Sequence, residues 1–251
     1  MNPFALIQYL AITFFSNVQT ITTKPFIPDS CNHVDAAEIK QGYWIEYSGV
    51  KTSRSYKEFR GNYKNGVKDA HWIEFQGAET TISKIENFVD GKKDGIFFEF
   101  EAGTINKEEW WKNGQLNGLS KIYHNGTRLS VEANYKNGLL NGLKTSWYSN
   151  GKKQEQGAYI NGKRTDKAIW YFDDGKKSIE YTYVDGERTG PMKTYHKNEV
   201  IATEGAYLNN ELDGNFKEYH PSGKLKSEGK YALGKKIGVW KEFDEEGKLL
   251  K

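Results

Sequence analysis

Glutamate recurs at corresponding positions along this 251-residue chain, and it is a residue type that could serve as a general acid or base. The recurring residues are Glu46, Glu74, Glu99, Glu218 and Glu242. These glutamates recur because the segment that contains them is repeated, so their recurrence is explained if they are solvated strand residues without a chemical role. The sequence shows no Ser, Cys or Thr nucleophile in a recognisable setting and no glycine-rich phosphate or dinucleotide loop. We therefore expect no catalytic residue and no cofactor.

Cysteine and histidine could supply a metal site, but their spacing does not favour one. A structural zinc site needs about four ligands, whereas Cys31 and His33 stand in the short, isolated segment CNH. The other histidines follow no ligand spacing; they are His71, His124, His196 and His220. We expect all five to be ordinary surface or strand residues, and we predict no metal site. A single cysteine cannot form an internal disulfide, so it indicates no compartment.

The segments that position these side chains are repeated. YKNGLLNG, residues 135–142, recurs with small changes, for example as WKNGQLNG from Trp111 and as YVDGERTG from Tyr183. The aromatic residue that leads each copy lies at positions 63, 88, 111, 135, 159, 183, 207 and 231, so the period is close to 24 residues. A period held through so many copies indicates an array of supersecondary units that stabilise one another.

Each copy carries the signals of a β-hairpin, in which two short aromatic-rich segments flank Gly with Asn or Asp. The turn glycines should hold positive φ, with Asn210 as the substitute in one copy. These structural turn residues are Gly66, Gly91, Gly114, Gly138, Gly162, Gly186 and Gly234. A second glycine column, interrupted by Ala70 and Asp166, should begin the second strand. With a four-residue loop, Tyr63 would lie opposite Trp72.

Alternation along the second strand gives the sheet two faces. One face, the ladder face, carries an aromatic residue in every copy, at positions 75, 100, 123, 147, 171, 195, 219 and 243. It also carries aliphatic residues such as Ile45, Ile73 and Leu143. We expect the ladder face to be the drier, structural side.

The opposite face, the ring face, mixes aromatic rings with glutamate, so we expect it to stay partly wet. Its rings are the candidate partner-binding residues: Trp44, Trp72, Phe97 and Trp240. Glycines two residues before the lead aromatic should let rings lie flat over bare backbone; they are Gly61, Gly157, Gly205 and Gly229. The alternative role for every ring is packing within the sheet.

The N-terminal part of the chain differs from the array. Residues 4–15 form a mostly apolar run that is shorter than a membrane span of about 20 residues but has the length of a signal-peptide apolar region. We predict a signal peptide over residues 1–23, a linker or N-terminal cap over 24–41 and the repeat array over 42–251. This predicts a secreted or cell-envelope protein. The alternative is an N-terminal capping strand or helix in a cytoplasmic protein.

The charges indicate no polyanionic partner. The formal net charge is +3, and acidic and basic residues are interspersed along the chain. A nucleic-acid-binding domain normally shows a clustered basic face. We therefore predict no nucleic acid among the partners.

The repeat columns resemble MORN repeats, and more closely the MORN-variant units of the bacterial YwqK-type family. The matching text is EGKYALGKKIGVWKEFDEEGKLL over residues 228–250 and EGAYLNNELDGNFKEYHPSGKLKS over residues 204–227. The resemblance covers about residues 42–251, and the chain departs from it at Asn210, Asp166 and the copy with Pro191. Together with the hairpin signals, it predicts an all-β fold. We expect an elongated array of about eight β-hairpins that form a single antiparallel meander sheet.

The resemblance also implies a class of function. MORN arrays serve as scaffolds, as membrane-associated modules and as appendages to enzymes, while the YwqK-type family is commonly labelled as the antitoxin of a toxin–antitoxin pair. It thus implies a non-catalytic repeat scaffold that mediates protein–protein interaction, with a toxin as partner. The alternative is a secreted or envelope-associated module that binds glycan or lipid, since rows of Trp and Tyr suit stacking on sugars.

Overall fold

A computed structural model describes residues 30–50, 56–77 and 81–250 of the chain. Within these ranges the regular elements are all strands, and 20 of them form one open antiparallel meander sheet. The predicted all-β meander is therefore confirmed. The predicted signal peptide over residues 1–23 lies outside the described residues, as does the linker up to residue 29, so both stay predictions.

The chain divides into two compact units, and we describe each by itself. The first contains the described residues up to Lys107 together with Asn125–Thr127. Its strands are β1 (His33–Val34), β2 (Lys40–Ser48), β3 (Lys57–Lys64), β4 (Val67–Gln76), β5 (Thr81–Val89), β6 (Lys92–Lys93), β7 (Gly95–Glu101) and the first part of β8 (Thr104–Lys112). Consecutive strands from β2 to β5 pair antiparallel, and β5 also pairs with β6 and β7.

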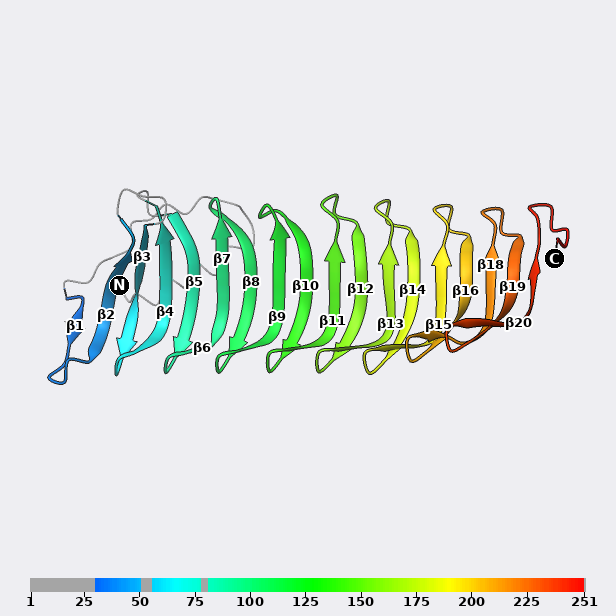
Figure 1. Cartoon of the computed structure of the whole chain (residues 1–251). Coiled ribbons are helices and arrows are strands. Elements are labelled where there is room, and N and C mark those ends of the chain that lie inside the picture. Colours follow the sequence, from blue (N-terminus) through cyan, green and yellow to red (C-terminus); the bar gives the residue numbers. More distant parts are fainter. Residues whose placement is uncertain (1–29, 51–55, 78–80, 251) are drawn as a thin grey trace. The chain divides into compact units, whose positions relative to one another are not determined.

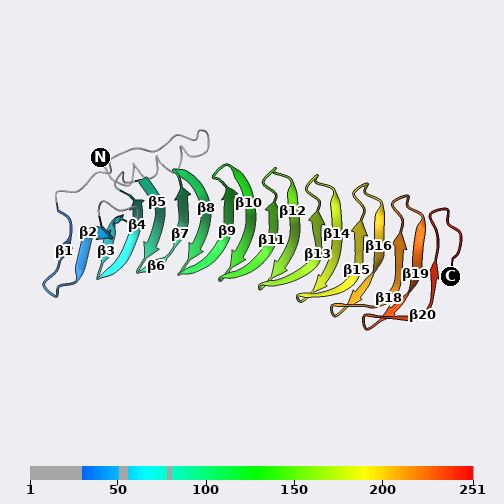
Figure 2. The same cartoon turned by 45° about the horizontal axis from the view of Figure 1, so that its top comes forward.

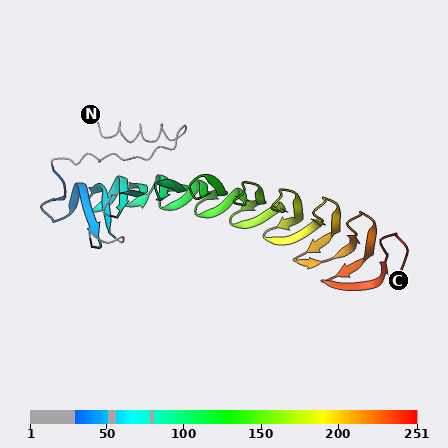
Figure 3. The same cartoon turned by 90° about the horizontal axis from the view of Figure 1, so that it is seen from above.

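The second unit contains Glu108–His124 and the residues from Arg128 onward. After the end of β8, its strands are β9 (Gln115–His124), β10 (Arg128–Lys136), β11 (Leu139–Trp147), β12 (Lys153–Ile160), β13 (Lys163–Tyr171), β14 (Lys177–Val184), β15 (Glu187–Tyr195), β16 (Ile201–Leu208), β17 (Glu211–Leu212), β18 (Gly214–Tyr219), β19 (Leu225–Ala232) and β20 (Lys235–Glu242). Figures 1 and 2 show β9 to β16 side by side in chain order, and Figure 3 shows them as a single layer. Neither face of these strands is therefore covered by another described element.

The hairpin turns are tighter than the sequence predicts. Lys136 pairs with Leu139, so the loop between β10 and β11 contains two residues instead of four. Both loop residues hold positive φ, 51° at Asn137 and 80° at Gly138, as a type I′ turn requires. The other turn glycines hold positive φ wherever the sequence predicts it, and Asn210 holds 71°.

The second glycine column begins a strand at Gly95 and Gly214, the first residues of β7 and β18, so the prediction is confirmed there. It is wrong for the remaining glycines of the column, which lie inside the second strand: Gly118, Gly142, Gly190 and Gly238. In β11, for example, Gly142 is the fourth residue of the strand and holds a φ of 114°. It lies where the pairing register between β10 and β11 shifts. Such a shift is a β-bulge, which adds a residue to one strand. The predicted pairing fails for the same reason, because Tyr63 pairs with Lys68. The Tyr63 and Trp72 rings still meet edge to face, with centroids 5.0 Å apart.

The turn amides join successive hairpins of the second unit. The N–H of Gly138 donates to the carbonyl of Leu116 at 2.8 Å, and the N–H of Gly162 donates to that of Leu140 at the same distance. The pattern continues in later copies, where Asn210 takes the place of glycine and donates to Arg188 at 2.9 Å. In each case the donor lies 22 residues after the acceptor in the chain, so every bond joins the same two positions of successive hairpins.

Side chains make a second set of bonds between hairpins, at the ends of the strands away from these turns. The histidine Nε2 atoms of His124, His196 and His220 lie 2.9–3.1 Å from carbonyl oxygens 23 residues later. The Tyr148 hydroxyl occupies the same column and donates to the Tyr171 carbonyl at 2.8 Å. His124 is the last residue of β9, and His196 and His220 directly follow β15 and β18, so all three have a structural role at strand ends that their sequence spacing did not reveal.

The ring face contains much of the core. Trp72 is only 1% exposed, and a Cβ atom added at Gly61 would collide with its indole ring. The glycine prediction is confirmed at Gly61, and also at Gly205 and Gly229, which lie under Phe216 and Trp240. It is wrong at Gly157, where no ring lies over the backbone and Ala168 and Arg164 are the nearest side chains.

Backbone strain at the turn leads to a first prediction. Gly138→Val should lower the free energy of unfolding by about 1–3 kcal/mol, because a β-branched residue is strained at positive φ. A Cβ atom there meets no neighbour within 4 Å, so crowding does not contribute. Lys136→Val is the matched control, because Lys136 is an exposed residue of β10 and strands favour valine. Urea unfolding measures both variants, and equal midpoints would contradict the strained-turn assignment.

Packing under the indole leads to a second prediction. Gly61→Ala should destabilise the protein by about 1–3 kcal/mol, because the added methyl overpacks against a ring that has no room to move. Gly157→Ala is the control: the nearest atoms there are the Arg164 guanidinium at 3.2 Å and the Ala168 methyl at 3.3 Å. Thermal unfolding of both variants compares the two sites. A Gly61→Ala midpoint equal to or above that of Gly157→Ala would show that Trp72 does not pack on Gly61.

Candidate functional site

The structure places the predicted partner-binding rings in or beside the core. Trp72 and Phe97 are buried, and Trp44 and Trp240 are half-buried. The expectation that the ring face stays partly wet is therefore wrong at Trp72 and Phe97, whose side chains present almost no surface to a partner. The difference arises because residues on neighbouring strands cover the rings, which the residue types alone did not reveal.

Basic side chains provide part of this cover. Lys68 pairs with Tyr63, and its Nζ lies 4.2 Å from the centroid of the Trp72 ring. In the second unit, Arg188 lies 4.4 Å from the Tyr207 ring and Lys236 lies 4.0 Å from the Trp240 ring. A cation over an aromatic face is attracted by the ring quadrupole. The signal in the sequence is the position of these cations two residues after the turn residue, in phase with the repeat.

The recurring glutamates in the first unit are partners of basic and hydroxyl groups. Glu46 bonds to Lys40, and the Tyr63 hydroxyl donates to it at 3.2 Å. Glu74 is buried and accepts hydrogen bonds from Lys57 at 2.8 Å and from Ser83 at 3.0 Å. Burial alone would raise the pKa of Glu74, but these two bonds hold the pKa below its usual value. An ionised carboxylate held by two hydrogen bonds is suited to holding the sheet together and not to donating a proton.

The ladder face differs between the two units. In the first unit Ile45 and Phe75 are buried, as expected for a dry side. In the second unit, however, Leu143 is 47% exposed and Val239 is 85% exposed, so the same expectation is wrong there. The single layer of strands explains this, because nothing among the described elements packs against this face (Figure 3).

Tyrosines of the ladder bond to glutamates of the same hairpin in the second unit. The Tyr123 hydroxyl donates to Glu108 at 2.8 Å, and the Tyr219 hydroxyl donates to Glu204 at 2.6 Å. Burial and the hydrogen bond to the Glu204 carboxylate raise the pKa of Tyr219 to about 12. The tyrosines are thus neutral donors that hold the glutamates in place, and they are no source of a nucleophilic phenolate near neutral pH.

An apolar patch lies on the ladder face of the second unit. It consists of Trp110, which is 47% exposed, Leu119 and Leu143. Leu119 pairs with Asn134, whose amide donates to the Leu143 carbonyl at 3.2 Å, so the two leucines flank one residue. A Cβ atom at Gly118, next to Leu119, would lie 3.0 Å from the Trp110 Cβ. Trp110 was missed in the sequence because other copies carry Asn, Thr, Ala or Lys in its column.

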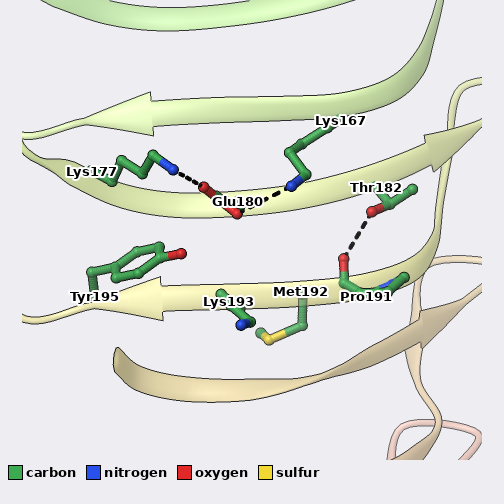
Figure 4. A pocket seen from close by; sticks show the side chains of 8 residues that line it. All are labelled: Lys167, Lys177, Glu180, Thr182, Pro191, Met192, Lys193 and Tyr195. Atoms are coloured by element: carbon green, nitrogen blue, oxygen red, sulfur yellow. Dashed lines mark hydrogen bonds and ion pairs between the residues drawn. The ribbon is translucent and has the colours of Figure 1, made fainter. Parts of the chain in front are cut away.

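A shallow hollow of about 260 Å³ lies farther along the same face (Figure 4). Strands β13, β14 and β15 supply its lining residues: Lys167, Lys177, Glu180, Thr182, Pro191, Met192, Lys193 and Tyr195. The buried Glu180 carboxylate lies 2.7 Å from Lys177 Nζ and 3.6 Å from Lys167 Nζ. Burial alone would raise the pKa of Glu180, but the two lysines hold the pKa below its usual value. The hollow therefore combines an ionised carboxylate with several cations.

Two further properties concern only the described part of the chain. No group of three or more His, Cys, Asp or Glu side chains there is arranged to hold a metal ion. No helix in those ranges could cross a lipid bilayer.

Comparison with known proteins identifies the type of repeat in part of the chain. Residues 140–161, 212–232 and 236–251 match the family model described as the MORN repeat variant. No curated protein matches the chain. MORN repeats are typically non-catalytic modules for interaction with proteins or membranes. The three matched segments all belong to the second unit, so the similarity to the MORN repeat variant lies in that unit.

Proposed function

We propose that the protein is a non-catalytic scaffold that binds a protein partner through the ladder face of its second unit. The observation that supports this most is the apolar patch, where Trp110 and Leu143 each expose close to half of their surface. Tryptophan is enriched among the interface residues that contribute most to binding. Exposed apolar surface rimmed by polar residues often marks an interaction site, and the charged residues of the hollow lie on the same face.

A toxin is the partner that the resemblance to the YwqK-type family supports. An antitoxin of the binding type needs a preformed surface that covers its target, and it needs no reaction centre. A single layer of strands joined by regular hydrogen bonds is suited to this task, because its surface requires little rearrangement before binding. The apolar N-terminal run supports an encounter with the partner in the cell envelope or outside the cell.

Glycan or lipid binding is the second candidate. It is favoured by the exposed ring of Trp110, since an exposed indole can stack on a sugar ring or enter a membrane interface. The two candidates differ in what should lie against Leu143, because stacking on Trp110 of β8 does not require contact with a leucine of β11.

Site-specific crosslinking in the native host distinguishes these candidates. A photo-crosslinking amino acid at position 143 should give a discrete protein adduct, because Leu143 belongs to the apolar patch. The same amino acid at position 144 is the control, since Lys144 follows in β11 and its side chain points to the ring face. Trp110→Ala should reduce adduct formation at position 143 about tenfold or more, as expected for the loss of a binding hot spot.

Three outcomes would contradict the proposed protein partner. One is a protein adduct that forms from position 144 and not from position 143. Another is adduct formation at position 143 that Trp110→Ala leaves unchanged while circular dichroism shows an intact fold. The third is recovery of wall glycan or lipid, without protein, from position 143, which would support the second candidate.

A further inference from the structure

The central row of the ladder face alternates in charge across consecutive strands of the second unit. The alternation follows from the register, in which each residue is the direct partner of the next: Glu180, Lys193, Glu204, Lys217, Glu228 and Lys241. Directly paired side chains on one face lie close enough to interact. The row is therefore a built feature of the face, repeated with the hairpins, and not a chance grouping of surface charge.

The glutamates of this row are engaged with other groups. Glu180 holds Lys177 and Lys167, as described for the hollow. Glu204 accepts the hydrogen bond from Tyr219. Glu228 lies 3.2 Å from Lys241 Nζ.

Two lysines of the row are left without an ion pair within the described residues. They are Lys193, which lines the hollow, and Lys217, and both are half-buried. A half-buried lysine lays its apolar stem along neighbouring surface, so its ammonium group has less conformational freedom to lose when an anion binds. Figure 4 shows Lys193 beside the hollow, apart from the bridge that Glu180 makes between Lys177 and Lys167.

The distance between these lysines selects a ligand shape. Lys193 lies on β15 and Lys217 on β18, with β16 between them, so two strand spacings separate their backbones. At about 4.8 Å per spacing this distance is about 9.6 Å. A polypeptide in the polyproline II conformation has three residues per turn and rises about 3.1 Å per residue. Side chains three residues apart then point to the same side at a separation of about 9.3 Å.

The alternation of charge discriminates against a uniform polyanion. Glu204 lies between the two lysines and would repel a ligand that carries negative charge at every position. A peptide that has neutral residues between its acidic residues avoids this repulsion. Like-charge contact against the wrong ligand is a common source of specificity, so the row favours a spaced acidic peptide over nucleic acid or an anionic lipid surface.

We propose that Lys193 and Lys217 bind two acidic side chains, three residues apart, in an extended segment of the partner protein. The segment crosses β15, β16 and β18, and the hollow gives its first carboxylate room beside Lys193. This inference rests on the proposed function in one respect, since it takes the partner to be a protein.

Fluorescence anisotropy with the full chain tests the inference with defined peptides. The probe is a labelled, proline-containing peptide with glutamate at every third position, and its control is a permuted peptide of the same composition with adjacent glutamates. The probe should bind at least tenfold more tightly than the control. Lys193→Gln and Lys217→Gln should each weaken probe binding about fivefold or more, whereas Lys136→Gln, a change at an exposed lysine of β10, should leave it unchanged.

Several results would overturn the inference. One such result is a probe that does not bind at all. Another is probe binding that stays unchanged in Lys193→Gln and Lys217→Gln, provided that both variants keep the unfolding midpoint of the unaltered chain. Equal binding of the permuted peptide, of an oligothymidylate or of phosphatidylserine vesicles would reveal a general basic surface. Trp110→Ala should not alter probe binding. A failed probe with intact crosslinking at position 143 would therefore overturn this inference alone, and loss of the protein adduct would overturn the proposed function.

Discussion

The structure of the second unit depends on a hydrogen bond from the amide of each turn to a carbonyl of the preceding hairpin. Positive φ at Gly138, Gly162 and Gly186 directs the amide out of its own hairpin, and the acceptor lies 22 residues earlier in each case. Asn210 makes the same bond, because asparagine tolerates this conformation better than most residues. Since every hairpin is attached to its neighbour at the same place, equivalent side chains fall into columns across the strands.

These columns give the two faces different roles. On the ring face, Trp72 lies between the backbone of Gly61 and the ammonium group of Lys68. Trp240 lies in the same way between Gly229 and Lys236. Most of this face is therefore used for stability. The ladder face of the second unit has no such cover, and it carries Trp110 and the row of alternating charge at fixed spacing. The proposed binding site therefore lies on the face that packing leaves exposed.

Much of the architecture could be predicted from the sequence, because period and turn chemistry are local properties. The 24-residue spacing, the hairpins and the close contact of Gly61 with a ring all follow from residue types in phase. The loop length could not be predicted, since two glycines four residues apart fit either a four-residue loop or a tight turn followed by a bulge. The burial of Trp72 depends on residues of neighbouring strands, which alternation along one strand does not reveal. Trp110 was missed because its column is otherwise polar or small, although the change of residue type within that column is a signal that could have pointed to it.

The central claim is that the ring face of this protein is packed and the ladder face of its second unit is open. Hydroxyl-radical footprinting of the full chain, read by mass spectrometry at single residues, tests this most directly. We expect rapid oxidation of Trp110 and Leu143 and strong protection of Trp72 and Phe97 under conditions in which the protein is folded. Rapid oxidation of Trp72 together with protection of Trp110 would contradict it, because the surface proposed to bind would then be the buried one.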